Sequence, residues 1–315
     1  MLVRSRRSWA LPERLATPES IYLDRRRFIA GLAAGGIAAS LPGFADEAPP
    51  PLYPAKRNEA YTLDRKVTDE KIVESYNNFY EFGMDKSVAE DAQALPVRPW
   101  QVKIDGMVEK ERLLDIDDLL RRMPIEERLY RHRCVEAWSF AVPWTGFPMK
   151  ALVALAGPTS GAKYVRMETF MNPDVAPAQG ELLYPWPYVE GLTLAEATNE
   201  LAFLVTGAYG KPVAKQDGAP LRLATPWKYG FKSIKSLVRF SFTDRRPTSF
   251  WMRLGPTEYG FWANVNPQVP HPRWSQATER SLGTGERVPT LIYNGYGEQV
   301  AGLYADLGSS EKLFM

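Results

Sequence analysis

The only cysteine in this chain of 315 residues directly follows three basic side chains. In the stretch RLYRHRCVEAWSF, Cys134 comes after Arg131, His132 and Arg133. The thiolate is the form of cysteine that attacks electrophiles or binds soft metals, and neighbouring cations lower the pKa of a thiol. The pattern therefore favours a nucleophile or a metal ligand at Cys134. The alternative is a thiol that only fills the core.

A hydrolase with a cysteine nucleophile would need a histidine base within hydrogen-bond reach. The chain has two histidines, His132 and His271. An extended strand would place both arginines on one face and His132 with Cys134 on the other. In such a strand His132 lies two residues from Cys134, without a clear geometry for taking the proton of the thiol. Two histidines and one cysteine also argue against a zinc site.

A basic stretch, WKYGFKSIKS (227–236), has the side chains that bind an anion. Lysines recur there at spacings of four and three, between two serines: Lys228, Lys232, Lys235, Ser233 and Ser236. Ammonium and hydroxyl groups of this kind donate to phosphate oxygens, and Arg222 precedes the stretch closely enough to join the same site. The alternative is a solvated basic face.

The stretch SYNNFYEFG (75–83) places two amides beside aromatic side chains. Asn77 and Asn78 offer donors and acceptors next to Tyr80 and Glu81. Asparagine also favours turns, so a capped turn is the alternative to a binding role.

The elements that must position these residues indicate a β-rich α+β fold. The chain has 26 prolines and 23 glycines, which is a high number for an all-helical protein. The patterns predict a helix over 69–76 with an ordered loop over 77–83, a strand over 100–108 that turns at Asp105-Gly106, a helix over 117–122, a strand over 127–134, a loop and then a helix over 148–156, a strand over 162–170, and further short strands around an irregular loop at 263–280.

Residues 1–45 have the features of a twin-arginine export signal. Arg25 and Arg26 precede an apolar run, 28–41, that is short for a membrane span, and small residues follow at Gly43 and Ala45. The alternative is a basic anchor helix. A Pro-rich linker is expected over 46–60 and a single domain over 61–315. No cysteine follows the run, so lipid anchoring at a cysteine is excluded.

Removal of residues 1–45 would change the charge of the chain. That segment contains seven arginines and three acidic residues, so the remainder has 39 − 7 = 32 basic and 37 − 3 = 34 acidic side chains. A net charge near −2 without a basic tract argues against nucleic-acid binding.

Five stretches together resemble one known family. YNNFYEFG, YRHRCVEAWSF with VPWTGFP, PWKYGFKSIKS, EYGFWANVNP and HPRWSQATER are similar to the periplasmic protein-methionine-sulfoxide reductase catalytic subunits of the MsrP/YedY type. The resemblance runs from about residue 61 to about residue 305. It implies a sulfite-oxidase-like molybdopterin-binding fold and a molybdenum–molybdopterin cofactor without an added nucleotide.

The resemblance also implies roles for individual residues. Cys134 matches the metal ligand, and Asn78 and Glu136 match polar residues near the metal. The pterin contacts of the family correspond to Asn77, Tyr80, Glu81, Thr169, Asp217, Arg222, Ser233, Ile234 and Lys235. At position 217 the family pattern has Asn, and a carboxylate cannot donate the hydrogen bonds of an amide. Asp217 therefore either is protonated at the pterin or makes a different contact.

The activity implied is reduction of methionine sulfoxide, in both the R and S configurations, in oxidised periplasmic proteins. The implied partners are a membrane haem-containing electron donor of the MsrQ type and the twin-arginine export machinery. The alternatives are a sulfite-oxidase-like or other small-oxide molybdenum oxidoreductase, a cysteine hydrolase or transpeptidase without metal, and a protein that holds a pterin without turnover.

Overall fold

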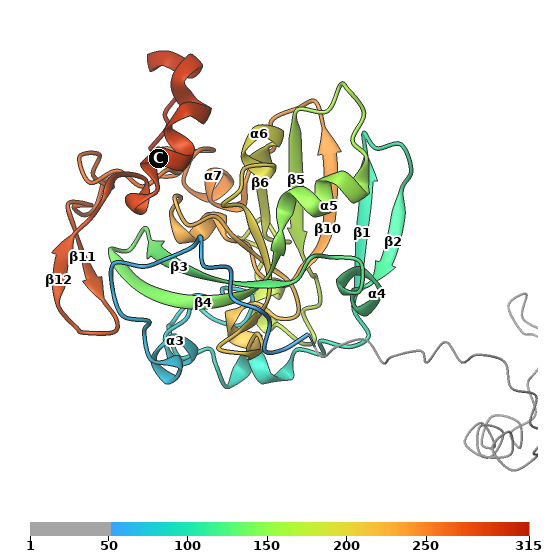
Figure 1. The fold of residues 1–315 in the computed structure, drawn as a ribbon, viewed down its shortest axis with the longest axis horizontal. Coiled ribbons are helices and arrows are strands. Elements are labelled where there is room, and N and C mark those ends of the chain that lie inside the picture. The colour runs from blue at the N-terminus through green and yellow to red at the C-terminus, as the bar shows by residue number, and fades with distance from the viewer. Residues whose placement is uncertain (1–51, 315) are drawn as a thin grey trace, which may run out of the picture. The chain divides into compact units, whose positions relative to one another are not determined.

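A computed structural model describes residues 52–314, so the predicted signal, 1–45, lies outside the described residues. The chain forms two mixed β-sheets with short helices at their ends and in the connections (Figure 1). This arrangement confirms the predicted β-rich α+β class. Among the described residues, no helix is long and apolar enough to cross a membrane.

The smaller sheet has five strands in the order β2-β1-β10-β5-β6. Only β1 and β10 pair in parallel within it; the other pairs are antiparallel. The strands are β1 Gln101–Gly106, β2 Arg112–Asp115, β5 Tyr164–Thr169, β6 Val189–Thr193 and β10 Leu237–Thr243.

The larger sheet has seven strands, and the long hairpin of β3 and β4 forms its centre. Its main path is β12-β11-β4-β7-β8, with β3 paired to β4 and β9 paired to β7. The strands are β3 Glu126–Cys134, β4 Trp138–Pro148, β7 Phe203–Ala208, β8 Lys211–Pro212, β9 Arg222–Ala224, β11 Thr278–Ser281 and β12 Arg287–Pro289.

The helices are short, and several of them flank the segments that form the site. The α-helices are α3 Glu70–Ser75, α4 Ile116–Leu120, α5 Met149–Ala156, α6 Leu194–Ala197, α7 Phe250–Leu254 and α8 Gly297–Val300. The 3-10 helices are η2 Asp91–Ala94, η3 Pro177–Gly180, η4 Lys215–Asp217, η5 Gly230–Lys232, η6 Ile292–Gly295 and η7 Ala301–Ser310.

The elements predicted before residue 170 are confirmed, with ends shifted by at most two residues. The one exception follows Cys134, where a loop was expected and the structure has strand β4. All eleven residues of β4 are buried, so the strand shows no alternation of polar and apolar residues. Pro143, Gly146 and Pro148 within it are also residues that disfavour strands in general.

Glycine at position 146 allows β4 to approach β7 closely. A Cβ atom added there would lie 2.0 Å from the carbonyl oxygen of Leu204, in backbone that cannot move aside. The ladder between the two strands shifts register at this point, between Thr145 and Gly146. The glycine therefore serves the close approach of two buried strands.

Part of the predicted linker is packed against the sheet. The Tyr53 hydroxyl donates to the carbonyl oxygen of Thr206 over 2.8 Å, and the Arg57 guanidinium pairs with Glu127 at 2.6 Å. The Pro-rich composition indicated few side chains to bury, but Tyr53 and Arg57 form contacts with residues that are distant in the sequence. The ordered body therefore includes residues that precede position 61.

Candidate functional site

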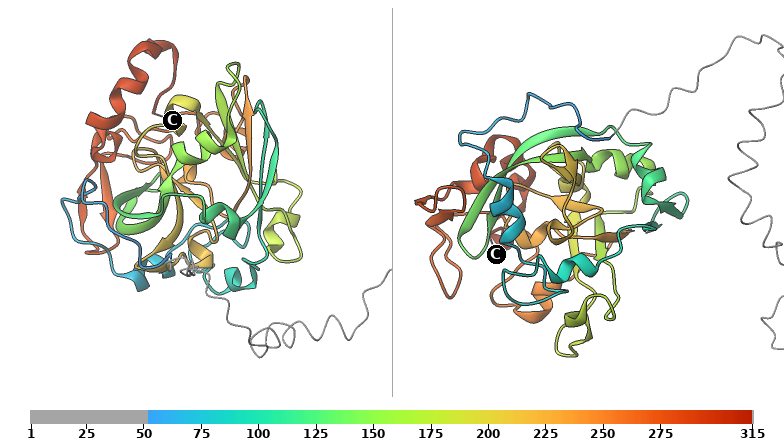
Figure 2. Two further views of the ribbon diagram at one scale, coloured as in Figure 1. Left: turned by 45° about the vertical axis from the view of Figure 1, so that its right-hand side comes forward. Right: turned by 90° about the horizontal axis from the view of Figure 1, so that it is seen from below.

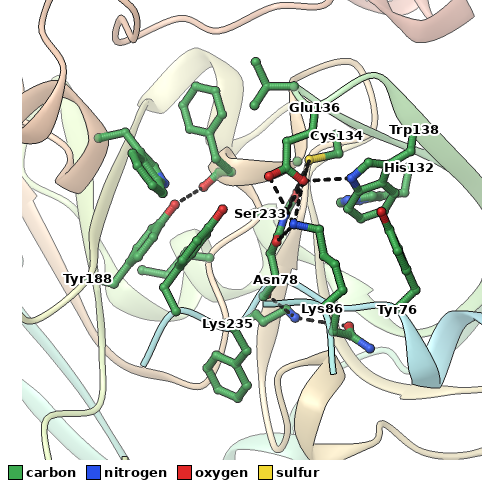
Figure 3. Close-up of a pocket in the computed structure, with 18 of the residues that line it drawn as sticks. Tyr76, Asn78, Lys86, His132, Cys134, Glu136, Trp138, Tyr188, Ser233 and Lys235 are labelled. Carbon is green, nitrogen blue, oxygen red and sulfur yellow. Dashed lines mark hydrogen bonds and ion pairs between the residues drawn. The ribbon is translucent and has the colours of Figure 1, made fainter. Parts of the chain in front are cut away.

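A cavity of about 630 Å³ lies beside the C-terminal end of β3. Segments far apart in the sequence form its walls: 76–86 after α3, 132–138 around the thiol, 230–235, and the aromatic residues at 251, 259 and 274 (Figure 3). Cys134 is 5 % exposed and lies on this cavity.

The structure brings most of the predicted site residues to this one cavity. Those that line it are Asn77, Asn78, Tyr80, Glu81, Cys134, Glu136, Arg222, Ser233, Ile234 and Lys235. Thr169 and Asp217 do not line it. The hydroxyl of Thr169 donates to the carbonyl oxygen of Lys235 over 2.8 Å, so it fixes the main chain behind the wall.

The thiol sits at the start of a tight turn between β3 and β4. Cys134 pairs with Trp138 across the hairpin, and the amide of Ala137, at φ +61°, donates to the Cys134 carbonyl. The Cys134 Sγ atom lies 3.7 Å from Asn78 Nδ2 and 3.7 Å from Glu136 Oε2. The turn thus presents the sulfur between an amide and a carboxylate.

The two arginines before the thiol point away from the cavity. Arg133 is fully buried, and its guanidinium donates to Glu279 and Gln276 over 2.7 Å each. Arg131 pairs with Asp64 at 2.8 Å. The alternation predicted for an extended strand is therefore correct, because His132 and Cys134 line the cavity and the arginines do not.

The side chains around Cys134 do not lower the pKa of its thiol, contrary to the expectation. Burial, and next the negative charge of Glu136, raise the pKa of Cys134 to about 12. The Glu136 main-chain amide, and then the charges of Lys86 and Arg133, oppose this rise without cancelling it. The prediction from the three basic neighbours was wrong because two of them are neutralised by acidic partners elsewhere. A thiolate at this position needs a positive charge bound in the cavity.

His132 also supplies no positive charge. Burial, together with the charges of Arg222, Lys235 and Arg133, lowers the pKa of His132 well below the usual range, so the imidazole is neutral. Its ring stacks on Phe140 with centroids 4.6 Å apart. A Cβ atom at Gly230 would lie 2.5 Å from His132 Nε2, so glycine lets the backbone of η5 approach the ring.

A polar cluster surrounds the carboxylate of Glu136 (Figure 3). Lys86 Nζ lies 2.8 Å from Glu136 Oε2 and also bonds the side-chain oxygen of Asn78. Trp138 Nε1 donates to the same carboxylate over 2.9 Å. Burial alone would raise the pKa of Glu136, but the bonds from Lys86, Trp138 and Asn78 hold it below the ordinary value. Glu136 is therefore a carboxylate at neutral pH.

Two cations form the inner wall: Arg222 is buried and Lys235 is half-buried. Lys235 Nζ donates to the carbonyl oxygens of Gln216 and Asn78 over 2.6 and 2.8 Å. Arg222 donates to the carbonyl oxygens of Asp217 and Ser233 over 2.8 and 3.2 Å. Within residues 52–314, neither cation forms an ion pair with a carboxylate at 4 Å or less. Burial lowers the pKa of Arg222 to about 10.

The free-energy cost of removing the charges of Lys235 and Arg222 from water indicates an anionic ligand. Burial, and next the charge of Arg222, lower the pKa of Lys235 below the usual lysine range. Desolvating a cation without a counter-ion is expensive, and a bound phosphate would repay that cost. Burial also raises the pKa of Glu81 to about 7, so this wall offers a neutral carboxyl group beside the cations at mildly acidic pH.

Comparison with known proteins gives the family. Residues 90–251, just over half of the chain, match the oxidoreductase molybdopterin binding domain. The chain belongs to the oxidoreductase molybdopterin-binding family. One solved structure that it resembles is the sulfane dehydrogenase SoxCD from Paracoccus pantotrophus, at 16 % sequence identity and a TM-score of 0.45, over 84 % of this chain and 68 % of that chain.

The cavity residues fit the cofactor of the molybdopterin-binding family. Cys134 is the one thiol of the chain, it lines the cavity, and a thiolate is a soft metal ligand. Arg222, which is buried, and Lys235, which is half-buried, line the cavity without a carboxylate partner in the described part of the chain, so they suit a phosphate group. Cys134 would hold the molybdenum, and Lys235 with Arg222 and Ser233 would hold the anionic end of the pterin.

Sequence reasoning missed two charged residues, Lys86 and Arg273, and most of the aromatic wall. Lys86, in the stretch GMDKS, has no motif that would single it out, yet it bonds both Asn78 and Glu136. The aromatic lining residues without a predicted role come from separate segments, and they include Tyr76, Trp138, Phe140, Tyr188, Phe231, Trp251, Tyr259 and Trp274. Six of them stand in the stretches that carry the resemblance, and the high Trp count is a further sequence signal.

Asp217 acts through its main chain. Its carbonyl oxygen accepts the bond from Arg222, which an Asn at this position would accept equally well. Burial raises the pKa of Asp217, and the charges of Lys235 and Arg222 oppose this only in part. The departure from the family pattern thus leaves the contact to Arg222 intact and adds a titrating carboxyl group.

The variant Asp217→Asn should remove the loss in free energy of unfolding that the parent suffers when the Asp217 carboxyl ionises at higher pH. Because the folded-state pKa is raised, the folded chain binds the proton more tightly than the unfolded chain, and stability falls as pH rises through the folded pKa. We expect the cofactor-free variant to gain about 1–2 kcal/mol over the parent at pH 8 and much less at pH 4.5. Urea unfolding at both pH values measures this, and an equal effect at both would contradict it.

Proposed function

We propose that this protein reduces methionine sulfoxide residues in periplasmic proteins and thereby repairs oxidised proteins. The observation that carries the proposal is the charge pattern beside Cys134. The cations at the outer part of the cavity are matched by carboxylates: Lys86 pairs with Glu136 at 2.8 Å, and Arg273 pairs with Glu258 at 2.9 Å. A neutral sulfoxide suits such a site, whereas the sulfite dianion would meet the Glu136 carboxylate.

The aromatic wall supports the same substrate. The rings of Trp138 and Phe140 stack beside the thiol with centroids 6.1 Å apart. The ring centroid of Trp251 lies 5.0 Å from that of Tyr80 and 5.0 Å from that of Tyr259. Thioether and methyl groups make favourable contacts with aromatic rings. The cavity thus offers apolar contacts for a methionine side chain and polar contacts for its oxygen.

Reduction of a sulfoxide to a sulfide consumes two electrons and two protons and releases water. The molybdenum–molybdopterin group, when bound, supplies the oxygen-atom transfer and the electrons. The chain's own part is to orient the substrate and provide hydrogen bonds. The Lys86 ammonium group, a donor of three hydrogens, lines the cavity and lies within bonding distance of Asn78 Oδ1 and of both Glu136 carboxylate oxygens. We propose that it turns one of these hydrogens to the sulfoxide oxygen when the substrate binds.

Steady-state kinetics with two substrates tests the proposal. Molybdenum-loaded protein should reduce both the R and S forms of methionine sulfoxide with a reduced viologen dye as donor, and it should oxidise sulfite at least a hundredfold less efficiently. Efficient sulfite oxidation would favour the sulfite-oxidase-like alternative. Natively purified protein that lacks molybdenum would instead favour a cysteine hydrolase.

We further propose a periplasmic location, reached by twin-arginine export, and a membrane haem-containing partner of the MsrQ type as electron donor. The variant Arg25→Lys/Arg26→Lys should keep the protein in the cytoplasm, because the export machinery reads the arginine pair. Cell fractionation and immunoblotting measure this. Unchanged export of the variant would contradict the twin-arginine assignment.

A further inference from the structure

The loop between β5 and β6 holds two leucines in solvent. Leu182 is 100 % exposed and Leu183 is 90 % exposed. The loop, 170–188, projects from the body of the protein in both views of Figure 2, where it is yellow-green. Single exposed leucines are ordinary, but an adjacent pair this exposed forms an apolar tip that needs a partner.

The loop is anchored at its base, so the leucines are presented by a fixed support. Gln179 is buried, and its side chain donates to the Phe170 carbonyl and accepts from the Asn172 amide, over 2.7 Å each. Beyond the leucines, Trp186 packs on Phe250 with ring centroids 4.8 Å apart. A tip held in this way loses little conformational entropy when it binds.

The same loop continues into the wall of the cavity. Tyr188 lines the cavity and stacks on Phe250 at 4.8 Å, and Phe250 contacts Trp251, which also lines it. Two methionines extend the apolar character from the cavity rim to the start of the loop. Met84 lines the cavity and is 52 % exposed, and Met171 is 49 % exposed.

These positions are clustered. Of the large hydrophobic side chains that are exposed among the described residues, half belong to this rim and loop: Met84, Met171, Leu182 and Leu183. The segments that carry the two methionines are neighbours, because the rings of Phe82 and Phe170 lie 6.2 Å apart. The start of the loop therefore lies beside the cavity rim that carries Met84, and its end, at Tyr188, lines the cavity.

We propose that Leu182 and Leu183 dock the apolar residues that flank a methionine sulfoxide in a protein substrate. The inference rests on the proposed function and specifies its substrate class: sulfoxides within apolar stretches of polypeptide. In this proposal, the apolar residues that flank the sulfoxide in the sequence contact the loop when the sulfoxide enters the cavity.

The charge of the loop favours a polypeptide over a membrane surface. Its charged residues are both acidic, Asp174 and Glu181, and it contains no lysine or arginine. Peripheral binding to anionic lipid relies on basic residues near the apolar ones. An acidic tip is repelled by such a surface, whereas an apolar peptide carries no such charge.

The test uses the double variant Leu182→Ser/Leu183→Ser, loaded with molybdenum cofactor and driven by a reduced viologen dye. Its substrates are free methionine sulfoxide and two peptides with one central methionine sulfoxide, flanked by Leu, Val and Phe in one and by Ser and Gly in the other. Leu113→Ser is the matched control, because Leu113 is a 60 % exposed leucine on β2 that does not line the cavity.

We expect the double variant to lose roughly tenfold or more in kcat/KM for the apolar peptide, because two leucine contacts are removed. Its kcat/KM for the other two substrates should stay within about twofold of the parent, as should all values for Leu113→Ser. An equal loss on all three substrates, or no loss on the apolar peptide, would overturn the proposal.

A binding measurement separates this inference from the proposed function. Fluorescence anisotropy with the apolar peptide, carrying reduced methionine and a fluorescent label, reports docking without turnover. Weaker binding to the double variant alone supports the inference even if no sulfoxide is reduced. Equal binding to parent and variant overturns it, and binding of the parent tip to anionic lipid vesicles, lost in the variant, would assign the loop to a membrane instead.

Discussion

Cys134→Ser is expected to remove bound molybdenum and all turnover from a chain that stays folded. The thiol is 5 % exposed and is the one thiol on the cavity, and a serine hydroxyl is a hard, weakly acidic replacement. The fold should persist because serine is close to cysteine in size. The hairpin ladder between β3 and β4 also uses only the main chain of residue 134.

Metal analysis, circular dichroism and turnover with methionine sulfoxide together measure this outcome. Ser139→Ala serves as the control, since Ser139 is buried in β4 close to the thiol but does not line the cavity. That control should keep both metal and activity. Stoichiometric molybdenum or full turnover in Cys134→Ser would show that the metal is held elsewhere.

Lys235→Met should reduce cofactor retention by about 10- to 100-fold. The lysine ammonium group faces the cavity and has no carboxylate partner within residues 52–314, so an anionic cofactor is its natural counter-ion. A charge-assisted hydrogen bond contributes about 1.5–3 kcal/mol, which corresponds to this range. Cofactor content after extended dialysis, measured as molybdenum per chain, reports the loss.

The pH dependence of cofactor retention is a second test of the contact between Lys235 and the cofactor. Burial lowers the pKa of the free lysine, and a bound anion would raise it, so binding takes up a proton. The parent should therefore retain cofactor better at pH 6 than at pH 9, and this slope should shrink in Lys235→Met. Lys215→Met is the control, because Lys215 bonds a main-chain carbonyl outside the cavity. An unchanged slope would argue against contact between Lys235 and the cofactor.

The sequence was informative where chemistry depends on local spacing. The alternation of β3 could be predicted from its residues, and with it the placement of Cys134 and His132 on one face. The resemblance to a known family brought together amides, acids and cations that the structure does place around one cavity. Their roles toward the cofactor remain predictions.

The sequence was misleading where a residue's partners lie far along the chain. Arg133 looked like a stabiliser of the thiolate, but its charge is matched by Glu279, which lies 146 positions later. Strand β4 escaped notice because burial on both faces removes the alternation that identifies a strand. Lys86 reaches Glu136 only through the fold of 76–86, for which local patterns give no rule.

The carbonyl oxygen of Val135 joins the turn that carries the thiol to the last quarter of the chain. It accepts bonds from Trp274 Nε1 over 2.7 Å and from the Gln276 side chain over 2.8 Å. The turn that carries the thiol is thus joined to a wall that is made about 140 residues later. Every residue proposed to contact the cofactor precedes position 236, whereas Trp251, Tyr259 and Trp274 of the cavity wall follow it. The last quarter of the chain therefore supplies wall rather than proposed cofactor ligands.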